Sequence, residues 1–264
     1  RVLDMQTEAR SAQQYRKNIS AMTDHSSAAY GTITGLKNIA VRAGELAVRA
    51  DDLKSPEELS IFAREITQLI QHAAELANAE NRGYPMFAGT RSDQTPFSVT
   101  TNAAGNVTAV DYAGNTDTAV AEINSGVTFG VHNPGVNNSG TGPRGLVTDS
   151  RFGADLFNHL ISLQDNLNSG NIAAIKSTDQ TNLRADEEHL ILQMADNGAL
   201  RSRLEQSNSL AANRITSLEK GISDEVDADL AQTLVHLNRT QNAYTAALQT
   251  AGTILNKSLL DYLR

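Results

Sequence analysis

Residues 12–50 read AQQYRKNISAMTDHSSAAYGTITGLKNIAVRAGELAVRA, and their pattern sets the expected fold class. Small and apolar residues recur at spacings of three and four, and Ser26 is the one polar member of the set. Such a seven-residue period is typical of a long helix that packs one face against other helices. At 1.5 Å per residue the helix would be roughly 60 Å long, so we expect an elongated helical rod. The repeat comprises Ala12, Tyr15, Ile19, Met22, Ser26, Ala29, Ile33, Leu36, Ala40, Ala43, Ala47 and Ala50.

Glycines inside this helix leave its continuity open. Gly31, Gly35 and Gly44 each cost about 1 kcal/mol relative to alanine, so the sequence permits a break at residues 31–35.

A second helix is predicted directly after the first. Ser55 and Glu58 form a capping box, with Pro56 at the first helical position. Gly83 is the predicted end of this helix. The short turn between the two helices predicts an antiparallel pair. The apolar positions of the second helix are Leu59, Phe62, Ile66, Leu69, Ala73 and Leu76.

The composition changes in the middle of the chain, where four of the five prolines and about half of the glycines fall between Gly83 and Gly145. Short runs rich in Val, Thr, Ile and Phe alternate there with Gly and Asn turns, which predicts a β-meander. Its strands are expected at 97–101, 107–112, 118–123 and 127–132. Residues 133–144 are expected to form a loop.

Helical periodicity returns after this region. We expect a helix up to residue 167, a short piece at 172–175, and a long helix from about Asp179 to Gly221. Ser223 is a candidate N-cap for a separate last helix. The predicted architecture is mainly α with a small inserted β domain. Residues 1–88 and 151–221 form a discontinuous antiparallel helical rod, 89–150 the β insert, and 222–264 a terminal coiled-coil helix.

The last helix carries an apolar face that the predicted fold leaves uncovered. Because the chain opens at Arg1 in mid-pattern, we expect an N-terminal helix outside this sequence to be its partner. An apolar face of this length favours assembly with other molecules. The expected assembly interface comprises Leu230, Leu234, Leu237, Tyr244, Leu248, Leu255, Leu259, Tyr262 and Leu263.

Composition and motifs argue against several functions. The formal charge of −8 and the pI near 5.2 disfavour nucleic acid as a partner. Cysteine is absent, and no apolar run of about 18 residues or cleavable signal peptide is visible. The acidic residues 224–229 lack the EF-hand spacing, and His189 is interpreted as a helix-surface residue rather than a metal ligand. We therefore expect no catalytic residues, cofactor, metal or membrane insertion.

Five motifs in order resemble the flagellin family and, within it, the hook-filament junction proteins. They are Gln14-Tyr15-Arg16-Lys17-Asn18-Ile19, Arg42-Ala43-Gly44-Glu45-Leu46-Ala47-Val48, Asn81-Arg82-Gly83-Tyr84-Pro85-Met86-Phe87-Ala88-Gly89-Thr90, Ser223-Asp224-Glu225-Val226-Asp227-Ala228-Asp229-Leu230 and Ser258-Leu259-Leu260-Asp261-Tyr262-Leu263.

The resemblance implies a structural protein of the bacterial flagellum, exported by the type III apparatus without a cleaved signal peptide. It would form the junction ring between hook and filament, on which flagellin polymerises. Implied partners are further copies of itself, a second hook-associated protein on the hook side, flagellin on the filament side, and an export chaperone. The turn with Gly83, Tyr84, Phe87 and Gly89 would join rod to insert.

Three alternatives remain open at this point. A flagellin-type filament subunit is the nearest, although Asp261-Tyr262 and the turn at Phe87 argue against it. A binding or adhesive module would need exposed aromatic residues on the insert, where Phe97, Tyr112 and Phe129 are expected in the core. An enzyme carried on a flagellar scaffold lacks a recognisable catalytic motif.

Overall fold

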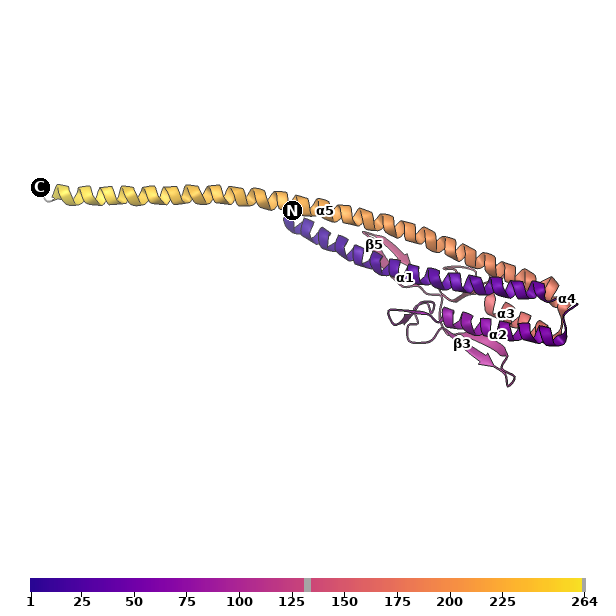
Figure 1. The fold of residues 1–264 in the computed structure, drawn as a ribbon. Coiled ribbons are helices and arrows are strands. Elements are labelled where there is room, and N and C mark those ends of the chain that lie inside the picture. The colour runs from indigo at the N-terminus through magenta and orange to yellow at the C-terminus, as the bar shows by residue number, and fades with distance from the viewer. Residues whose placement is uncertain (131–133, 263–264) are drawn as a thin grey trace. The chain divides into compact units, whose positions relative to one another are not determined.

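The computed structural model describes residues 1–130 and 134–262, without the side chains of 228–229 and 255–262. Contacts divide the chain into two units: Tyr15–Ser209, and Arg1–Gln14 together with the chain that follows Ser209. Helices dominate both units, and short strands occur between α2 and α3 (Figure 1). The expected class, mainly α with small β elements in the middle of the sequence, is confirmed.

The first helix is continuous. α1 runs from Val2 to Arg49, and the apolar repeat is buried along it apart from the half-buried Tyr15. Gly35 has an internal reason to be glycine, because a Cβ there would lie 2.7 Å from a methyl carbon of Leu76. Ile39 and Leu46 are also buried, which widens the apolar face beyond the predicted stripe. Packing on this face outweighs the helix-weakening effect of the glycines.

The second helix, α2 (Pro56–Ala77), begins as predicted and ends earlier. Ser55 Oγ accepts a hydrogen bond from Glu58 N at 3.2 Å, and Glu58 Oε2 accepts one from Ser55 N at 3.0 Å. The predicted end at Gly83 is wrong because Asn78 caps the helix and its side-chain amide pairs with both backbone groups of Phe97. Gly83 lies instead in the hairpin of β1 (Glu80–Asn81) and β2 (Tyr84–Pro85).

Strands form near the predicted places, but they do not form one meander. β3 (Phe97–Thr101) pairs with β4 (Val107–Tyr112), and β5 (Val120–Asn124) pairs with β6 (Val127–Gly130), as separate hairpins. Each hairpin has its own helical support. The first belongs to the core of α2 and α3, and the second packs on Ile19, Met22 and Leu204. Val131, His132 and Asn133, predicted as strand end and loop start, lie outside the described residues.

The segment expected to be a loop contains a small third sheet. β7 (Val136–Asn137) pairs in parallel with β8 (Thr148–Asp149), which pairs antiparallel with β9 (Ala154–Asp155). Asn137 Nδ2 donates to the carbonyls of Thr141 (2.7 Å) and Pro143, and so closes the intervening loop on itself.

The second helical half comprises α3 (Leu156–Ser169), α4 (Ile172–Ala174), a π-helical turn (Ile175–Asp179) and α5 (Gln180–Tyr262). The predicted break between Gly221 and Ser223 is wrong, because α5 continues through it. Ser223 Oγ bonds Asp227 Oδ2 at 3.1 Å within the helix, and a single glycine costs only about 1 kcal/mol.

One hydrophobic core joins the helices of residues 15–209 to the first hairpin. It contains Leu36 and Leu46 of α1, Ile66 of α2, Leu163 of α3 and Phe97 of β3. Phe97 stacks at 5.0 Å on Tyr112 and at 5.3 Å on Phe157. Gln164 is fully buried; it donates to the carbonyl of Val107 at 2.9 Å and accepts from Thr67 Oγ1 at 2.8 Å. The sequence boundaries of the β insert stay a prediction.

Candidate assembly surface

The distal part of α5 exposes its side chains throughout. Every residue from Leu230 to Ile254 is exposed. Of the predicted interface, Leu230, Leu234, Leu237, Tyr244 and Leu248 are between 51% and 68% exposed. The side chains of Leu255, Leu259 and Tyr262, and all of Leu263, lie outside the described residues.

Helical spacing places these side chains together. Leu230, Leu234, Leu237, Tyr244 and Leu248 follow one another at intervals of four, three, seven and four, so they lie on one face of the helix. Arg239 is the single Lys, Arg, Asp or Glu between Leu230 and Ile254. A helix surface that stays in water normally carries more charge. This apolar, weakly charged face is therefore suited to packing against another protein surface.

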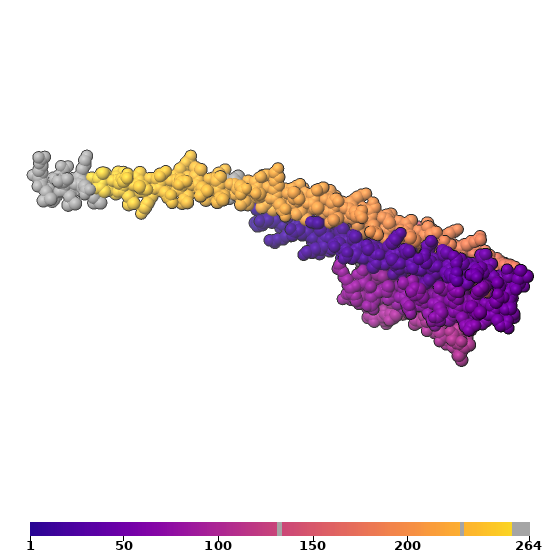
Figure 2. All heavy atoms as spheres, in the orientation of Figure 1, coloured from indigo at the N-terminus to yellow at the C-terminus, as the bar shows by residue number. Residues whose placement is uncertain are grey.

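The exposed stretch of α5 begins beyond the residues that pack against the N-terminal part of α1. Within the same unit, Ala9 and Ala12 of α1 and Ala211, Ile215 and Leu218 of α5 are buried. Arg214 pairs with Glu8, and Arg1 Nη1 lies 2.6 Å from Glu225 Oε1. Beyond this contact α5 continues as the yellow stretch of Figure 2.

Sequence reasoning missed part of this surface. Val226, Val235 and Ile254 are exposed at 47%, 51% and 62%. Val226 precedes Leu230 by one helical turn, so the same periodicity could have identified it. Val235 and Ile254 lie off the predicted face, and nothing in the spacing pointed to them.

The turn predicted as a domain junction is built around two left-handed glycines. Arg82 (φ 55°) and Gly83 (φ 81°) form the two-residue turn between β1 and β2, as a type I′ hairpin requires. Tyr84 is 61% exposed, whereas Phe87 is buried and its carbonyl accepts from Tyr112 Oη at 2.8 Å. Gly89 has φ 70°, and a Cβ there would lie 2.2 Å from Asn115 Oδ1.

The first family-like motif holds the second hairpin. Asn18 Nδ2 donates to the carbonyl of Glu122 at 2.8 Å, and Ile19 is buried beneath the hairpin. Phe129 lies below the guanidinium of Arg203, 4.2 Å from ring centroid to Cζ. These contacts give the motif a structural role.

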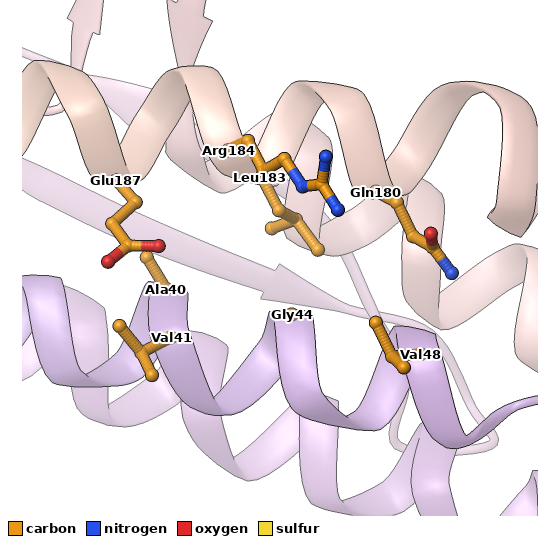
Figure 3. A pocket seen from close by; sticks show the side chains of 8 residues that line it. All are labelled: Ala40, Val41, Gly44, Val48, Gln180, Leu183, Arg184 and Glu187. Carbon is orange, nitrogen blue, oxygen red and sulfur yellow. The ribbon is translucent and has the colours of Figure 1, made fainter.

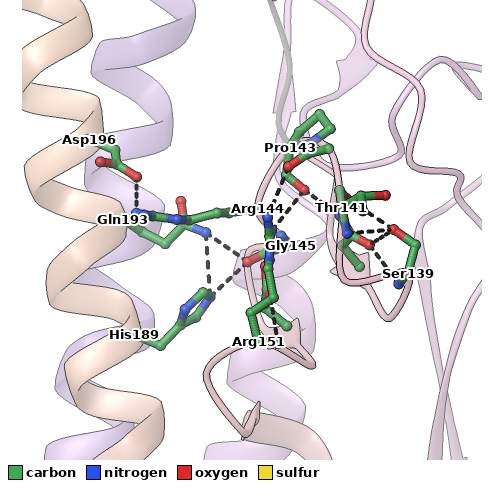
Figure 4. Close-up of polar contacts among 12 residues, drawn as sticks. Ser139, Thr141, Pro143, Arg144, Gly145, Arg151, His189, Gln193 and Asp196 are labelled. Carbon is green, nitrogen blue, oxygen red and sulfur yellow. Dashed lines mark hydrogen bonds and ion pairs between the residues drawn. The ribbon is translucent and has the colours of Figure 1, made fainter.

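A buried polar cluster attaches the loop after β7 to α5 (Figure 4). The carbonyl of Gly145 accepts from Gln193 Nε2 at 2.7 Å and from His189 Nε2 at 2.8 Å. His189 is 1% exposed, so its interpretation as a helix-surface residue is wrong. The burial of His189 could not be predicted from the sequence, because its hydrogen-bond partner, the carbonyl of Gly145, lies 44 residues away.

A buried ion pair lies at the end of this loop, in β8 and the turn after it. Asp149 is fully buried, and Arg151 Nε donates to its Oδ1 at 2.9 Å. Burial alone would raise the pKa of Asp149, but hydrogen bonds from Arg151 and from the amides of Arg151 and Gly145 outweigh it and lower that pKa. The cluster fixes a loop and contains no nucleophile paired with a base.

The described part of the chain contains neither a candidate metal site nor a candidate membrane span. No group of three or more His, Cys, Asp or Glu residues there could hold a metal ion. None of the helices, as far as they are described, combines the length and apolar character needed to cross a bilayer.

The fold is similar to several solved structures. FlgL of Bacillus cereus superimposes with a TM-score of 0.63 and 18% identity, covering 82% of this chain and 97% of its own. A putative flagellar hook-associated protein of Vibrio parahaemolyticus gives 0.70 and 16%, covering 84% and 95%. Flagellar hook-associated protein 3 of Legionella pneumophila gives 0.69 and 13%, covering 86% and 100%.

The fold is that of flagellar hook-associated proteins. The resemblance found in the motifs thus extends to the three-dimensional structure. No family model and no curated protein sequence matches the chain. At these identities the FlgL-like fold is what the similarity establishes.

Proposed function

We propose that this chain is a structural, non-catalytic component of the bacterial flagellum that forms the junction between hook and filament. It would assemble as a ring with copies of itself, contact a second hook-associated protein on the hook side, and present a surface on which flagellin polymerises. Export through the type III apparatus without a cleaved signal peptide, assisted by a chaperone, belongs to the same proposal.

The exposed apolar face of α5 is the observation that carries the proposal. Five large side chains on one face, each more than half exposed, are costly in a free monomer and useful in an assembly. The FlgL-like fold supports the flagellar setting, since it covers nearly the whole length of the similar structures. The five motifs support the junction role over a filament role.

Complementation of a strain that lacks its junction protein tests the proposal. The full-length gene should restore motility and keep flagellin on the cell. Replacing Leu237 and Leu248 by Asp should abolish both, because it places charges on the face that must be covered. The purified double variant should unfold at the same temperature as the parent, since both side chains are exposed.

A matched control substitutes residues off that face. Asn238→Asp with Gln249→Asp adds the same charge to the same helix and should leave motility intact. Full function of the Leu237→Asp, Leu248→Asp variant would remove the assembly role of this face. Filaments built from this chain itself would favour the flagellin alternative.

A further inference from the structure

A groove runs between α1 and α5 within residues 15–209 (Figure 3). It encloses about 160 Å³ and is lined on α1 by Ala40, Val41, Gly44 and Val48, and on α5 by Gln180, Leu183, Arg184 and Glu187. Val48 is 63% exposed at its rim. The groove thus offers an apolar floor in an accessible place.

Gly44 opens this groove without an internal reason to be glycine. Apart from its chain neighbours and the adjacent backbone of α1, no atom lies within 4 Å of the place where its Cβ would be, and its φ is not positive. Glycine there weakens the helix by about 1 kcal/mol relative to alanine. Gly198 is equally open, and it follows Gln180 by five helical turns on the same face. A bare helix surface allows close approach by another chain.

Arg184 and Glu187 supply charges on the α5 side. Neither takes part in a hydrogen bond or ion pair within the described part of the chain. In Figure 3, Glu187 points toward α1 across the groove, and Arg184 extends along α5 toward Gln180. They are therefore available to form ion pairs with an occupant that places an acidic side chain at Arg184 and a basic side chain at Glu187.

The chain itself carries a matching surface on α2. Ile61 is 56% exposed and is the one large apolar side chain of α2 that is exposed. Glu57 precedes it by one turn and Arg64 follows it by just under one turn. Ile61 thus has an acidic residue on one side and a basic residue on the other. The groove at Gly44 offers the complementary charges, Arg184 and Glu187.

We propose that a second copy of this chain packs the Ile61 face of α2 into the groove at Gly44. Glu57 of the second copy then pairs with Arg184, and its Arg64 pairs with Glu187. If each pair of copies makes this contact in one direction only, the contact is heterologous, and such contacts generate rings or open helices. The proposal deepens the proposed function by naming a contact between subunits.

Cysteine crosslinking of the purified full chain tests this contact, because the chain contains no cysteine of its own. A Gly44→Cys variant is mixed with an Ile61→Cys variant and oxidised. The matched control mixes Ile61→Cys with Asn38→Cys, an exposed α1 position outside the groove lining. We expect the first mixture to form the mixed disulfide about tenfold faster, because contact raises the effective concentration.

Reversing the two charges of a proposed ion pair, one in each chain, tests the contact by rescue of crosslinking, which a folding defect would not produce. Arg184→Glu in the Gly44→Cys chain should slow crosslinking about threefold, as for an exposed ion pair, and Glu57→Arg in the Ile61→Cys chain should restore it. Equal rates in the two mixtures, or absence of rescue, would overturn the proposal. Preferential Gly44→Cys self-linkage would show a two-fold contact instead. The assay needs no flagellum, so a negative result beside successful complementation rejects the contact and leaves the junction role intact.

Discussion

Individual glycines of the turn after α2 serve different purposes. Gly83 and Gly89 both have a positive φ, but only Gly89 has neighbours where a side chain would be. Asn115 fills that space; its Oδ1 accepts from Thr90 N at 2.8 Å and its Nδ2 donates to Thr90 Oγ1 at 2.8 Å. Glycine is therefore required at position 89 by both the positive φ and the close packing of Asn115, whereas at position 83 only the positive φ favours it.

This difference predicts the cost of two matched substitutions. Gly89→Val should lower the free energy of unfolding by more than about 3 kcal/mol, because it adds a steric overlap to an unfavourable φ. Gly83→Val should cost about 1–2 kcal/mol, from backbone strain alone. Urea unfolding of both variants measures the two values. Equal costs would contradict the structural role assigned to Gly89.

Buried polar residues mark the limit of what the sequence could reveal at this scale. The apolar positions of α1 were predictable because their partners follow from one period. Gln164 and His189 could not be identified as buried, because each bonds a backbone carbonyl that is distant in sequence, that of Val107 or of Gly145. The capping box at Ser55 was predictable since both partners lie within four residues.

At the scale of elements, a buried ion pair joins the start of α3 to α5. His159 Nδ1 lies 2.8 Å from Asp186 Oδ2, and Asp186 Oδ1 accepts from Asp155 N at 2.8 Å. Burial would lower the pKa of His159, but the hydrogen bond to Asp186 and the charges of Asp186, Asp155 and Asp179 outweigh it and raise that pKa. Burial raises the pKa of Asp186 despite its bond to His159.

Both shifts make stability fall as the pH rises, that of Asp186 from its unfolded pKa near 3.8 upward and that of His159 from about 6.5 upward. The folded chain holds these protons more tightly than the unfolded chain, so the contribution of His159 is complete below its unfolded pKa, about 6.5. It is lost as the pH rises through the raised folded value. We expect the free energy of unfolding, measured in urea from about pH 6 to 9, to fall over this interval.

His159→Gln should remove that decline. His72→Gln is the control, because His72 is 58% exposed on α2 and should leave the slope unchanged. A decline that persists in His159→Gln would assign the pH dependence to another group.

Prediction of the elements succeeded where periodicity was long and failed where local signals competed with packing. The helices and the four strands of the hairpins were found because their periods differ. Gly221 and Ser223 looked like a helix boundary, but neighbouring turns that favour helix carried α5 through. Two hairpins instead of one meander could not be foreseen, because each is stabilised by helices distant in sequence.

At the scale of the whole molecule, stability is unevenly distributed along α5. Residues 183, 190 and 204 are buried, whereas every residue from Leu230 to Ile254 is exposed. A helix without tertiary contacts is only marginally stable in water. The apolar face and its lack of a partner within this chain were predicted from the sequence, and the structure shows the side chains from Leu230 to Ile254 exposed. The role of this face in assembly stays a prediction.

Hydrogen exchange measures this difference directly. Amides of residues 230–254 should exchange at least about a hundredfold faster than those of residues 59–73 in α2, because opening the latter breaks the core. Exchange in residues 230–254 that slows with rising protein concentration would show self-association through this face. Equally slow exchange in both segments at high dilution would contradict the exposed state of α5.

The pairing of α1 with α5 also sets the order in which the chain can fold. Ser26 Oγ bonds Asn197 Oδ1, and Arg16 Nε bonds Asn208 Oδ1, across 171 and 192 residues of sequence. Local contacts form before such distant ones, since closing long loops costs entropy. During synthesis, α5 is made only after most of the chain has left the ribosome. Until then, the part of the α1 apolar face that packs on α5 has no partner. Unpaired apolar surface during that interval is a site for premature aggregation.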